Sequence, residues 1–242
     1  MSTHDEPRAV AERYARRSAA ADRYRPLRPE VQHALQERQR ALRVLLARAG
    51  MTAAGELRLT EVGCGSGANL LELLHLGFSP SHLQGIELLP DRFALARARL
   101  PAALRLIAGD ATQADIAPAS QDLVLQSTVF SSLLDDAFQQ RLADAMWRWL
   151  APGGAILWYD FTVDNPRNPD VRAVPLARLR RLFPEGRLDV RRVTLAPPLA
   201  RAAARLHPGL LPVLNALPLL RTHVLVRIDK RPGLSKARPG RT

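Results

Sequence analysis

Apolar and polar positions alternate along the central part of the chain with two different periods. Short apolar runs predict strands near residues 58–62, 83–87, 104–108, 123–127 and 155–160. Segments with helical spacing between these runs predict helices near residues 68–76, 90–100 and 136–150. This alternation indicates an α/β fold, with a parallel sheet and helices on both of its faces.

The N-terminal 50 residues follow a helical pattern alone. Pro7 and Pro29 suit helix starts, and Gly50 suits a C-terminal cap. An apolar stripe at helical spacing is formed by Val31, Leu35, Leu42, Leu45 and Leu46. We therefore expect residues 1–50 to form a helical extension, or lid, that packs on the domain or covers its ligand site.

The C-terminal part differs again. Pro175 opens a short predicted helix, and predicted strands over 188–195 and 222–228 flank a proline-punctuated helical stretch over 197–220. The domain is thus expected to span residues 51–229. Residues 230–242 are basic and rich in Pro and Gly, which predicts a disordered tail.

A glycine-rich turn follows the first predicted strand. Gly63, Gly65 and Gly67 alternate directly before a helix, so the backbone can adopt positive φ and a ligand can approach it closely. The turn also satisfies the dinucleotide pattern G-x-G-x-x-A, and Glu87 lies where a ribose-binding acid is expected. However, Glu61 beside the turn would repel a pyrophosphate and suits a cationic ligand.

The later strand ends carry a matching set of residues. Polar or small residues end strands two to four, at Glu87-Leu88, Asp110-Ala111 and Gln126-Ser127, and a Pro-Gly-Gly turn at 152–154 precedes strand five. Ligands of open parallel sheets bind outside these carboxyl ends. From about Leu57 to Asp160, the chain resembles the class I S-adenosylmethionine-dependent methyltransferases, in particular bacterial stand-alone enzymes of the methyltransferase-11 kind.

The resemblance implies a single Rossmann-like domain with a mostly parallel seven-stranded sheet that ends in an antiparallel strand pair. It implies S-adenosylmethionine as cofactor and S-adenosylhomocysteine as product. In the family, the position of Glu87 accepts the ribose hydroxyls and that of Asp110 accepts the adenine amino group. The implied cofactor-binding residues are Glu61, Gly63, Cys64, Gly65, Gly67, Asn69, Glu87, Leu88, Asp110, Ala111, Gln126 and Ser127.

The resemblance is less specific for the methyl acceptor. It implies catalytic roles for Asp160, at the end of strand five, and for Tyr14 in the extension. The implied substrate-binding residues are Phe130, Asp160, Asn165, Arg167 and Asn168. For the last three, an ordinary connector with Asn and Asp turn caps is supported equally well. For the segment around Tyr14, an exposed amphipathic helix is supported equally well.

Composition limits the other possibilities. The chain has 242 residues, enough for one α/β domain, and its single cysteine, Cys64, excludes an internal disulfide and favours the cytoplasm. The six histidines show no metal-ligand spacing, so no metal site is expected. No apolar run is long enough for a membrane span. The leucines and prolines of 208–220 suit either an apolar pocket or peripheral contact with a membrane surface.

The net charge of +12 is concentrated at the ends. Residues 1–50 carry 11 Lys/Arg against 6 Asp/Glu, and residues 229–242 carry 5 against 1. This distribution weakens a nucleic-acid interpretation. Nine arginines between Arg172 and Arg205 fit either a solvated face or an anion-binding surface.

The leading hypothesis is methyl transfer to an oxygen or nitrogen of a small molecule such as a natural product, a glycan or a lipid-linked precursor. An RNA or protein methyltransferase is the alternative, although Gln126-Ser127-Thr128-Val129 departs from the motif typical of base amino methylation. A nicotinamide-dependent oxidoreductase and a non-catalytic cofactor-binding protein are less favoured. The sequence does not fix the acceptor, the general base or the oligomeric state.

Overall fold

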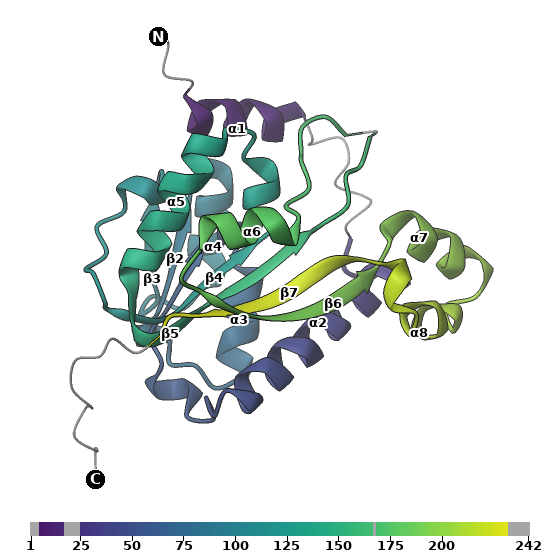
Figure 1. Ribbon diagram of the computed structural model, residues 1–242, viewed down its shortest axis with the longest axis horizontal. Helices are drawn as coiled ribbons and strands as arrows, with labels where there is room; N and C mark the ends of the chain where they lie inside the picture. Colours follow the sequence, from purple (N-terminus) through teal and green to yellow (C-terminus); the bar gives the residue numbers. More distant parts are fainter. Residues whose placement is uncertain (1–4, 17–24, 167, 232–242) are drawn as a thin grey trace.

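A seven-stranded sheet organises the protein, which we describe from a computed structural model over residues 5–16, 25–166 and 168–231 (Figure 1). The strand order is β3-β2-β1-β4-β5-β7-β6. The strands are β1 (Leu59–Val62), β2 (Leu83–Glu87), β3 (Arg105–Ala108), β4 (Gln121–Ser127), β5 (Leu150–Phe161), β6 (Arg187–Leu195) and β7 (Arg221–Asp229). Strands β1 to β5 are parallel, and β7 runs antiparallel to both β5 and β6. The predicted fold class is confirmed.

Helices cover both faces of the sheet. The α-helices are α1 (Glu6–Arg16), α2 (Pro29–Arg48), α3 (Ala68–His75), α4 (Pro90–Arg99), α5 (Asp136–Trp149), α6 (Leu176–Leu182), α7 (Pro197–Leu206) and α8 (Leu210–Asn215). The 3-10 turns are η2 (Ala54–Glu56), η3 (Pro80–His82), η4 (Ala111–Gln113), η5 (Phe130–Ser132) and η6 (Pro218–Leu220). Helices α5 and α6 pack on one face, and α2, α3 and α4 on the other.

The strand period of two produces two cores. Val124 and Ile156 point to the face covered by α5, whereas their neighbours Leu123 and Leu157 point to the face covered by α3. All four side chains are fully buried. Runs that are apolar on every position are typical of parallel strands buried on both faces.

Local capping chemistry sets several helix ends. Gly50 adopts φ +69° after α2, and the N–H of Met51 donates to the carbonyl of Leu46, which is the bonding of a Schellman cap. Asp135 caps α5, since its carboxylate accepts the N–H groups of Ala137 and Phe138 at 2.7 and 2.9 Å.

One boundary differs from the sequence prediction. Strand β5 begins at Leu150 and not near residue 155, because Leu150 already pairs with Gln121. The last strand pair is antiparallel as predicted, and the helical stretch predicted between its strands forms α7 and α8. Within the described residues, no helix combines the length and apolar character needed to cross a bilayer.

Candidate active site

A cavity of about 130 Å³ lies at the carboxyl ends of β1, β2, β3 and β4, the edge where the sequence predicts a ligand. Helix α1 supplies one wall through Pro7, Val10 and Tyr14. The predicted cofactor residues that line the cavity are Gly63, Glu87, Leu88, Asp110, Ala111 and Ser127. Its volume is well below the roughly 300–1,000 Å³ typical of ligand pockets, so α1 leaves little space in this conformation.

The three glycines of the turn after β1 differ in what surrounds them. All three have positive φ. A Cβ atom on Gly63 would lie 2.6 Å from Val129, and one on Gly67 would lie 2.8 Å from Leu100. A Cβ atom on Gly65 would meet nothing within 4 Å. Gly63 and Gly67 therefore allow close packing, whereas Gly65 leaves bare backbone beside open space.

Glu87 is buried at the end of β2 and fastens the glycine turn. Its Oε2 accepts the N–H of Gly65 at 2.7 Å, and its Oε1 accepts the N–H of Leu89 at 2.9 Å. A carboxylate oxygen has more than one acceptor site, so Glu87 keeps acceptor capacity on its cavity side. Asp110, at the end of β3, accepts the N–H and hydroxyl of Thr112 at 2.8 Å each.

The end of β4 contains a strained residue that the sequence does not reveal. Thr128 lines the cavity with φ +58°, a left-handed conformation that a β-branched residue rarely adopts. Its N–H donates to the carbonyl of Tyr159 at 2.8 Å. Gln126 is fully buried and supports the same turn, because its Oε1 accepts the N–H of Val129 at 3.1 Å. Such strain clusters at functional sites.

Glu61 and Asn69 form a second polar group, on the face of the sheet covered by α2 and α3. Asn69 donates to Oε1 of Glu61 at 2.6 Å, and Oε2 of Glu61 is buried without a partner among the described residues. Burial raises the pKa of Glu61 from 4.5 to about 8, although the hydrogen bond from Asn69 and the charge of Arg38 oppose the shift.

Arg38 joins these residues to the end of β4 and was missed by the sequence analysis. Its guanidinium donates to Asn69 at 2.6 Å and to the hydroxyl of Ser127 at 3.2 Å. Residue 38 falls within the apolar stripe of α2, between Leu35 and Leu42. A charged residue at that spacing is the signal that would have identified it.

Cys64 and Phe130 are placed in the core. Cys64 packs beneath the glycine turn with Leu70, and burial raises the pKa of its thiol. Phe130 is fully buried, with its ring centroid 4.5 Å from that of Trp158. Neither residue lines the cavity.

Asp160 is fully buried at the end of β5 and does not line the cavity. Its two oxygens accept the N–H groups of Ser131 and Phe161 at 3.1 and 3.0 Å. Burial raises the pKa of Asp160 from 3.8 to about 7, against the lowering effect of these hydrogen bonds. The carboxylate thus holds turn η5, whose last residue, Ser132, does line the cavity.

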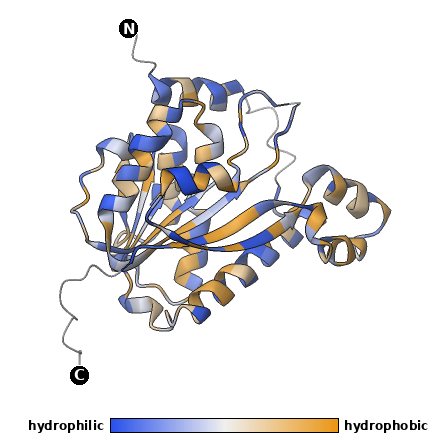
Figure 2. Ribbon diagram, viewed as in Figure 1, coloured by the Kyte–Doolittle hydropathy of each residue, from blue (hydrophilic) through white to orange (hydrophobic). Residues whose placement is uncertain are grey.

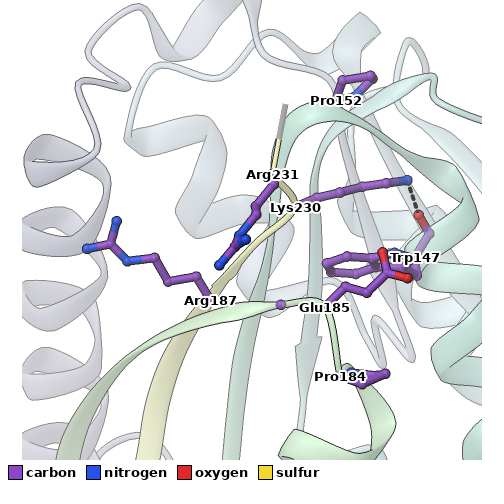
Figure 3. Close-up of a pocket in the computed structure, with 8 residues that line it drawn as sticks. Trp147, Pro152, Pro184, Glu185, Arg187, Lys230 and Arg231 are labelled. Atoms are coloured by element: carbon purple, nitrogen blue, oxygen red, sulfur yellow. Dashed lines mark hydrogen bonds between the residues drawn. The ribbon is translucent and has the colours of Figure 1, made fainter. Parts of the chain in front are cut away.

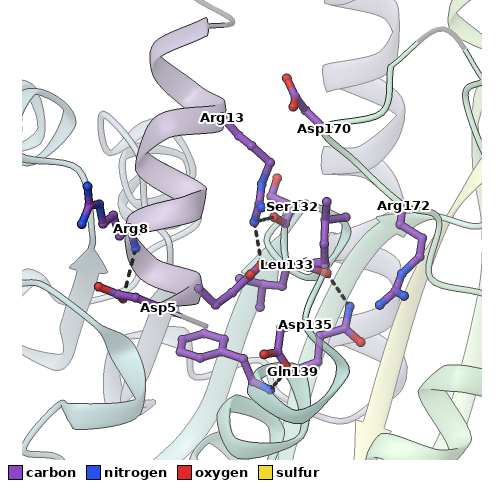
Figure 4. A network of polar contacts seen from close by, with 12 residues as sticks. Asp5, Arg8, Arg13, Ser132, Leu133, Asp135, Gln139, Asp170 and Arg172 are labelled. Carbon is purple, nitrogen blue, oxygen red and sulfur yellow. Dashed lines mark hydrogen bonds and ion pairs between the residues drawn. The ribbon is translucent and has the colours of Figure 1, made fainter. Parts of the chain in front are cut away.

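Helix α1 is fastened over the cavity by buried polar contacts (Figure 4). Arg13 pairs with Glu6 and donates to the carbonyl of Ser132 at 3.0 Å. The carboxylate of Glu6 also accepts the N–H of Leu134 at 2.7 Å. Tyr14 faces the cavity, with its hydroxyl 3.2 Å from that of Ser132.

The loop after β5 shows local capping. Asn168 accepts the N–H of Asp170 at 3.2 Å, and its own N–H donates to the carbonyl of Asn165 at 2.9 Å. Neither asparagine lines the cavity. Arg16 of α1 pairs with Asp170 at 2.6 Å, so the loop lies beside the covering helix. Arg167 lies outside the described residues.

A larger cavity of about 650 Å³ lies at the other end of the strands (Figure 3). Its lining includes Trp147, Arg187 and Lys230. The ammonium group of Lys230 donates to the carbonyls of Trp147 and Leu150 at 2.7 and 2.9 Å, so it stabilises the end of α5. Because this edge carries none of the predicted strand-end residues, the smaller cavity is the candidate site.

The arginines between Arg172 and Arg205 are spread over α6, β6 and α7. Arg172 pairs with Asp136, and Arg178 donates to Gln139 at 3.0 Å. These two contacts are internal, and the arrangement does not form a single anion site.

Comparisons with known proteins bear on the fold that carries this site. The family described as "Methyltransferase domain" matches residues 60–154. A search of curated proteins gives no significant match. Among solved structures, the chain resembles a 1,6-didemethyltoxoflavin-N1-methyltransferase from Burkholderia thailandensis, solved with S-adenosylhomocysteine, with a TM-score of 0.64 and 15% identity. The alignment covers 96% of this chain and 91% of that one.

Two further solved structures resemble the chain. A possible histamine N-methyltransferase from Thermotoga maritima has a TM-score of 0.61 and 16% identity, over 91% of this chain and 99% of that one. The [4+2]-cyclase SpnF has a TM-score of 0.58 and 15% identity, over 81% of this chain and 82% of that one. These similarities establish the fold. The family match includes the glycine turn and the ends of β2, β3 and β4, so residues 60–154 resemble a methyltransferase domain.

Proposed function

We propose that the protein transfers a methyl group from S-adenosylmethionine to an oxygen or nitrogen of a small molecule, such as a natural product, a glycan or a lipid-linked precursor. The observation that carries this proposal is the cavity at the strand ends, with Glu87, Asp110 and Ser127 in its wall and α1 across it. It is too confined for a folded RNA or protein surface to enter while α1 is docked.

The residues present fit the cofactor. A Cβ atom on Gly65 or Gly109 would enter open space, so a ligand can approach the backbone closely at both turns. Glu87 and Asp110 supply acceptors for hydroxyl and amino donors. Glu61 has one buried oxygen without a partner among the described residues, and the ammonium group of the cofactor would supply a hydrogen-bond donor to that oxygen.

Within this proposal, Arg38 and Ser127 bind the amino-acid end of the cofactor. The guanidinium of Arg38 lies between Ser127 and Asn69, and a guanidinium suits a carboxylate because it offers paired donors. Glu87 binds the ribose hydroxyls, and Asp110 with Ala111 binds the adenine ring. Bound S-adenosylmethionine supplies a methyl group already activated by a sulfonium.

The chain contributes orientation and exclusion of water. Tyr14 and Ser132 offer hydroxyl groups in the cavity wall and are placed to orient an acceptor. We assign Asp160 a positioning role, because it does not line the cavity and its oxygens accept two backbone N–H groups of the surrounding turns. Helix α1 acts as a lid that opens to admit the ligands. We place this chemistry in the cytoplasm, where the single thiol stays reduced.

Ligand binding and methyl transfer test the proposal separately. We expect S-adenosylhomocysteine, but not NAD, to raise the melting temperature, since a ligand at 100 times its dissociation constant stabilises by about 2.7 kcal/mol. Incubation with methyl-labelled S-adenosylmethionine and panels of hydroxyl and amine acceptors should label a small molecule. Stabilisation by NAD alone would overturn the cofactor assignment, and labelling confined to RNA or protein would overturn the acceptor class.

A further inference from the structure

Residues 196–220 form a protrusion with an apolar outer surface, here called the α7–α8 knob. Of the nine large hydrophobic residues that are exposed in the described chain, the knob contains six: Leu199, Leu206, Leu210, Val213, Leu217 and Leu219. Leu206 is 80% exposed and Leu219 is 96% exposed. Figures 1 and 2 show the knob at the right end of the sheet, with much of its ribbon hydrophobic. Such a concentration of exposed apolar groups indicates an interaction surface.

The knob is an ordered unit with its own small core. Leu195, Ala200, Ala203 and Leu211 are buried together, and α2 packs against both helices. The exposed leucines therefore belong to a folded unit and not to an unfolded segment. They are apolar side chains that a folded unit presents to its surroundings.

The charged residues of the knob itself, Arg201 and Arg205, have one sign. The sequence from Val190 to Ile228 contains no Asp or Glu. Arg201 and Arg205 lie on α7, one helical turn apart, and neither has an ion-pair partner among the described residues. Arg221, at the base of the knob, is instead engaged, since it donates to the carbonyl of Asn215 at 2.7 Å and lies 3.8 Å from Glu37.

We propose that the α7–α8 knob docks the protein on the surface of an anionic lipid bilayer. Exposed leucines beside unpaired arginines match the chemistry of interfacial helices, whose apolar side chains enter the headgroup region while their cations contact anionic lipids. A protein partner would instead need an acidic patch that complements Arg201 and Arg205 around a continuous apolar centre.

The knob lies at the same edge of the sheet as the cavity. It leaves β6 after Leu195 and enters β7 at Arg221, and the neighbouring His223 pairs with Phe161 at the carboxyl end of β5. Docking would hold this edge near the bilayer, where a lipid-linked acceptor would be available. The proposed docking does not depend on the proposed methyl transfer. The idea that the bilayer supplies the methyl acceptor does rest on that proposed function.

Vesicle co-sedimentation of the full chain tests the docking. We expect binding to vesicles of equal parts phosphatidylcholine and phosphatidylglycerol, weak binding to phosphatidylcholine alone, and release at high salt. The pair Arg201→Glu and Arg205→Glu should lower the partition coefficient by at least about fivefold for each arginine. The matched control, Arg180→Glu with Arg181→Glu on α6, changes the charge equally and should bind as the unmodified protein does.

A second pair of variants tests the apolar contribution. Leu206→Glu with Leu219→Glu should abolish sedimentation, whereas Leu95→Glu on α4 should not. All three leucines are exposed, and an unchanged thermal shift with S-adenosylhomocysteine would show that the fold is intact.

Several outcomes overturn the proposal. These are no binding to either vesicle, equal binding to both, or equal loss in the control variants. Light scattering that shows a dimer disrupted by the Leu206 and Leu219 variants, without vesicle binding, would assign the knob to a second copy of the chain. Failure of methyl transfer with vesicle binding retained would contradict the proposed function alone.

Discussion

The substitution Arg13→Ala tests whether docking of α1 controls cofactor affinity. Arg13 and Glu6 are both on α1, and their side chains are 10% and 1% exposed. Removing the guanidinium leaves the Glu6 carboxylate buried with the N–H of Leu134 as its remaining hydrogen-bond partner among the described residues, and it also removes the bond to the carbonyl of Ser132. The variant therefore makes the docking free energy of α1 less favourable and does not change the residues of the sheet core.

The magnitude follows from the buried pair. Breaking a buried ion pair by deleting one of its two partners costs about 3–5 kcal/mol of stability, because the other charge is left buried and uncompensated. Helix α1 has 11 residues and can carry Glu6 into water, so the cost cannot exceed the docking free energy of the helix. Helix α1 opens to admit the cofactor and closes over it again, so if only a fraction of the bound molecules recloses α1, the apparent dissociation constant rises by about the inverse of that fraction. We expect S-adenosylhomocysteine to bind about 10- to 100-fold more weakly.

Calorimetric titration measures this loss, and limited trypsin digestion at Arg16 reports undocking in both variants. The matched control is Arg8→Ala, since Arg8 is exposed and forms only a surface pair with Glu12. Exposed pairs of this kind contribute under about 1 kcal/mol. Adding Glu6→Gln to Arg13→Ala should recover part of the affinity, because the buried charge is gone. Affinity and digestion rates of Arg13→Ala equal to those of Arg8→Ala would refute the reasoning.

Five further predictions concern the site and the titratable groups of the protein. Gly65→Val should weaken S-adenosylhomocysteine binding in calorimetry without unfolding the domain, because a side chain enters the open space at a positive φ. Glu87→Ala should weaken binding by roughly 1.5–3 kcal/mol and also loosen the turn that it fastens; unchanged affinity would contradict its role. Since the folded pKa of Glu61 is raised to about 8, the cofactor-free protein should lose stability as pH rises from 4.5 toward 8, and Glu61→Gln should remove that slope from denaturant titrations. Since burial lowers the pKa of His223 from 6.5 to about 4, stability should fall as pH drops through that interval, and His223→Phe should flatten the acid limb. Asp160→Asn should cost about 1–3 kcal/mol of stability and reduce turnover with the pH–rate profile retained; a lost titration step with full stability would make Asp160 the base.

Local patterns in the sequence predict the central sheet well. The boundaries of β1 to β4 and of α3 to α5 fall within about two residues of the expected ranges. The reason is that these elements alternate regularly, and several are followed within two residues by a glycine or a proline, as at Gly63, Pro101 and Gly109. The turn before β5 was harder to place. Gly153 and Gly154 were expected only to reverse the chain, but both also exchange hydrogen bonds with Lys230 beyond β7, a pairing that depends on distant sequence.

The residues missed by the sequence analysis share one property. Arg38, Arg13 and Glu6 are charged side chains on N-terminal helices, and each is tied to residues more than 30 positions away. Periodicity identifies the helices but not what their polar positions contact. An unusual composition of the helix face was the available clue, as with Arg38 inside the apolar stripe.

The three strand-end carboxylates show why position alone does not define a ligand contact. Glu87, Asp110 and Asp160 all end parallel strands, so the sequence assigns each of them to the site. In the structure, every one of them accepts an N–H of the turn beside it. Buried backbone donors must be paired, and a carboxylate at a strand end is the nearest acceptor. A ligand therefore meets only the acceptor capacity that remains, and this capacity faces the cavity for Glu87 and Asp110 but not for Asp160.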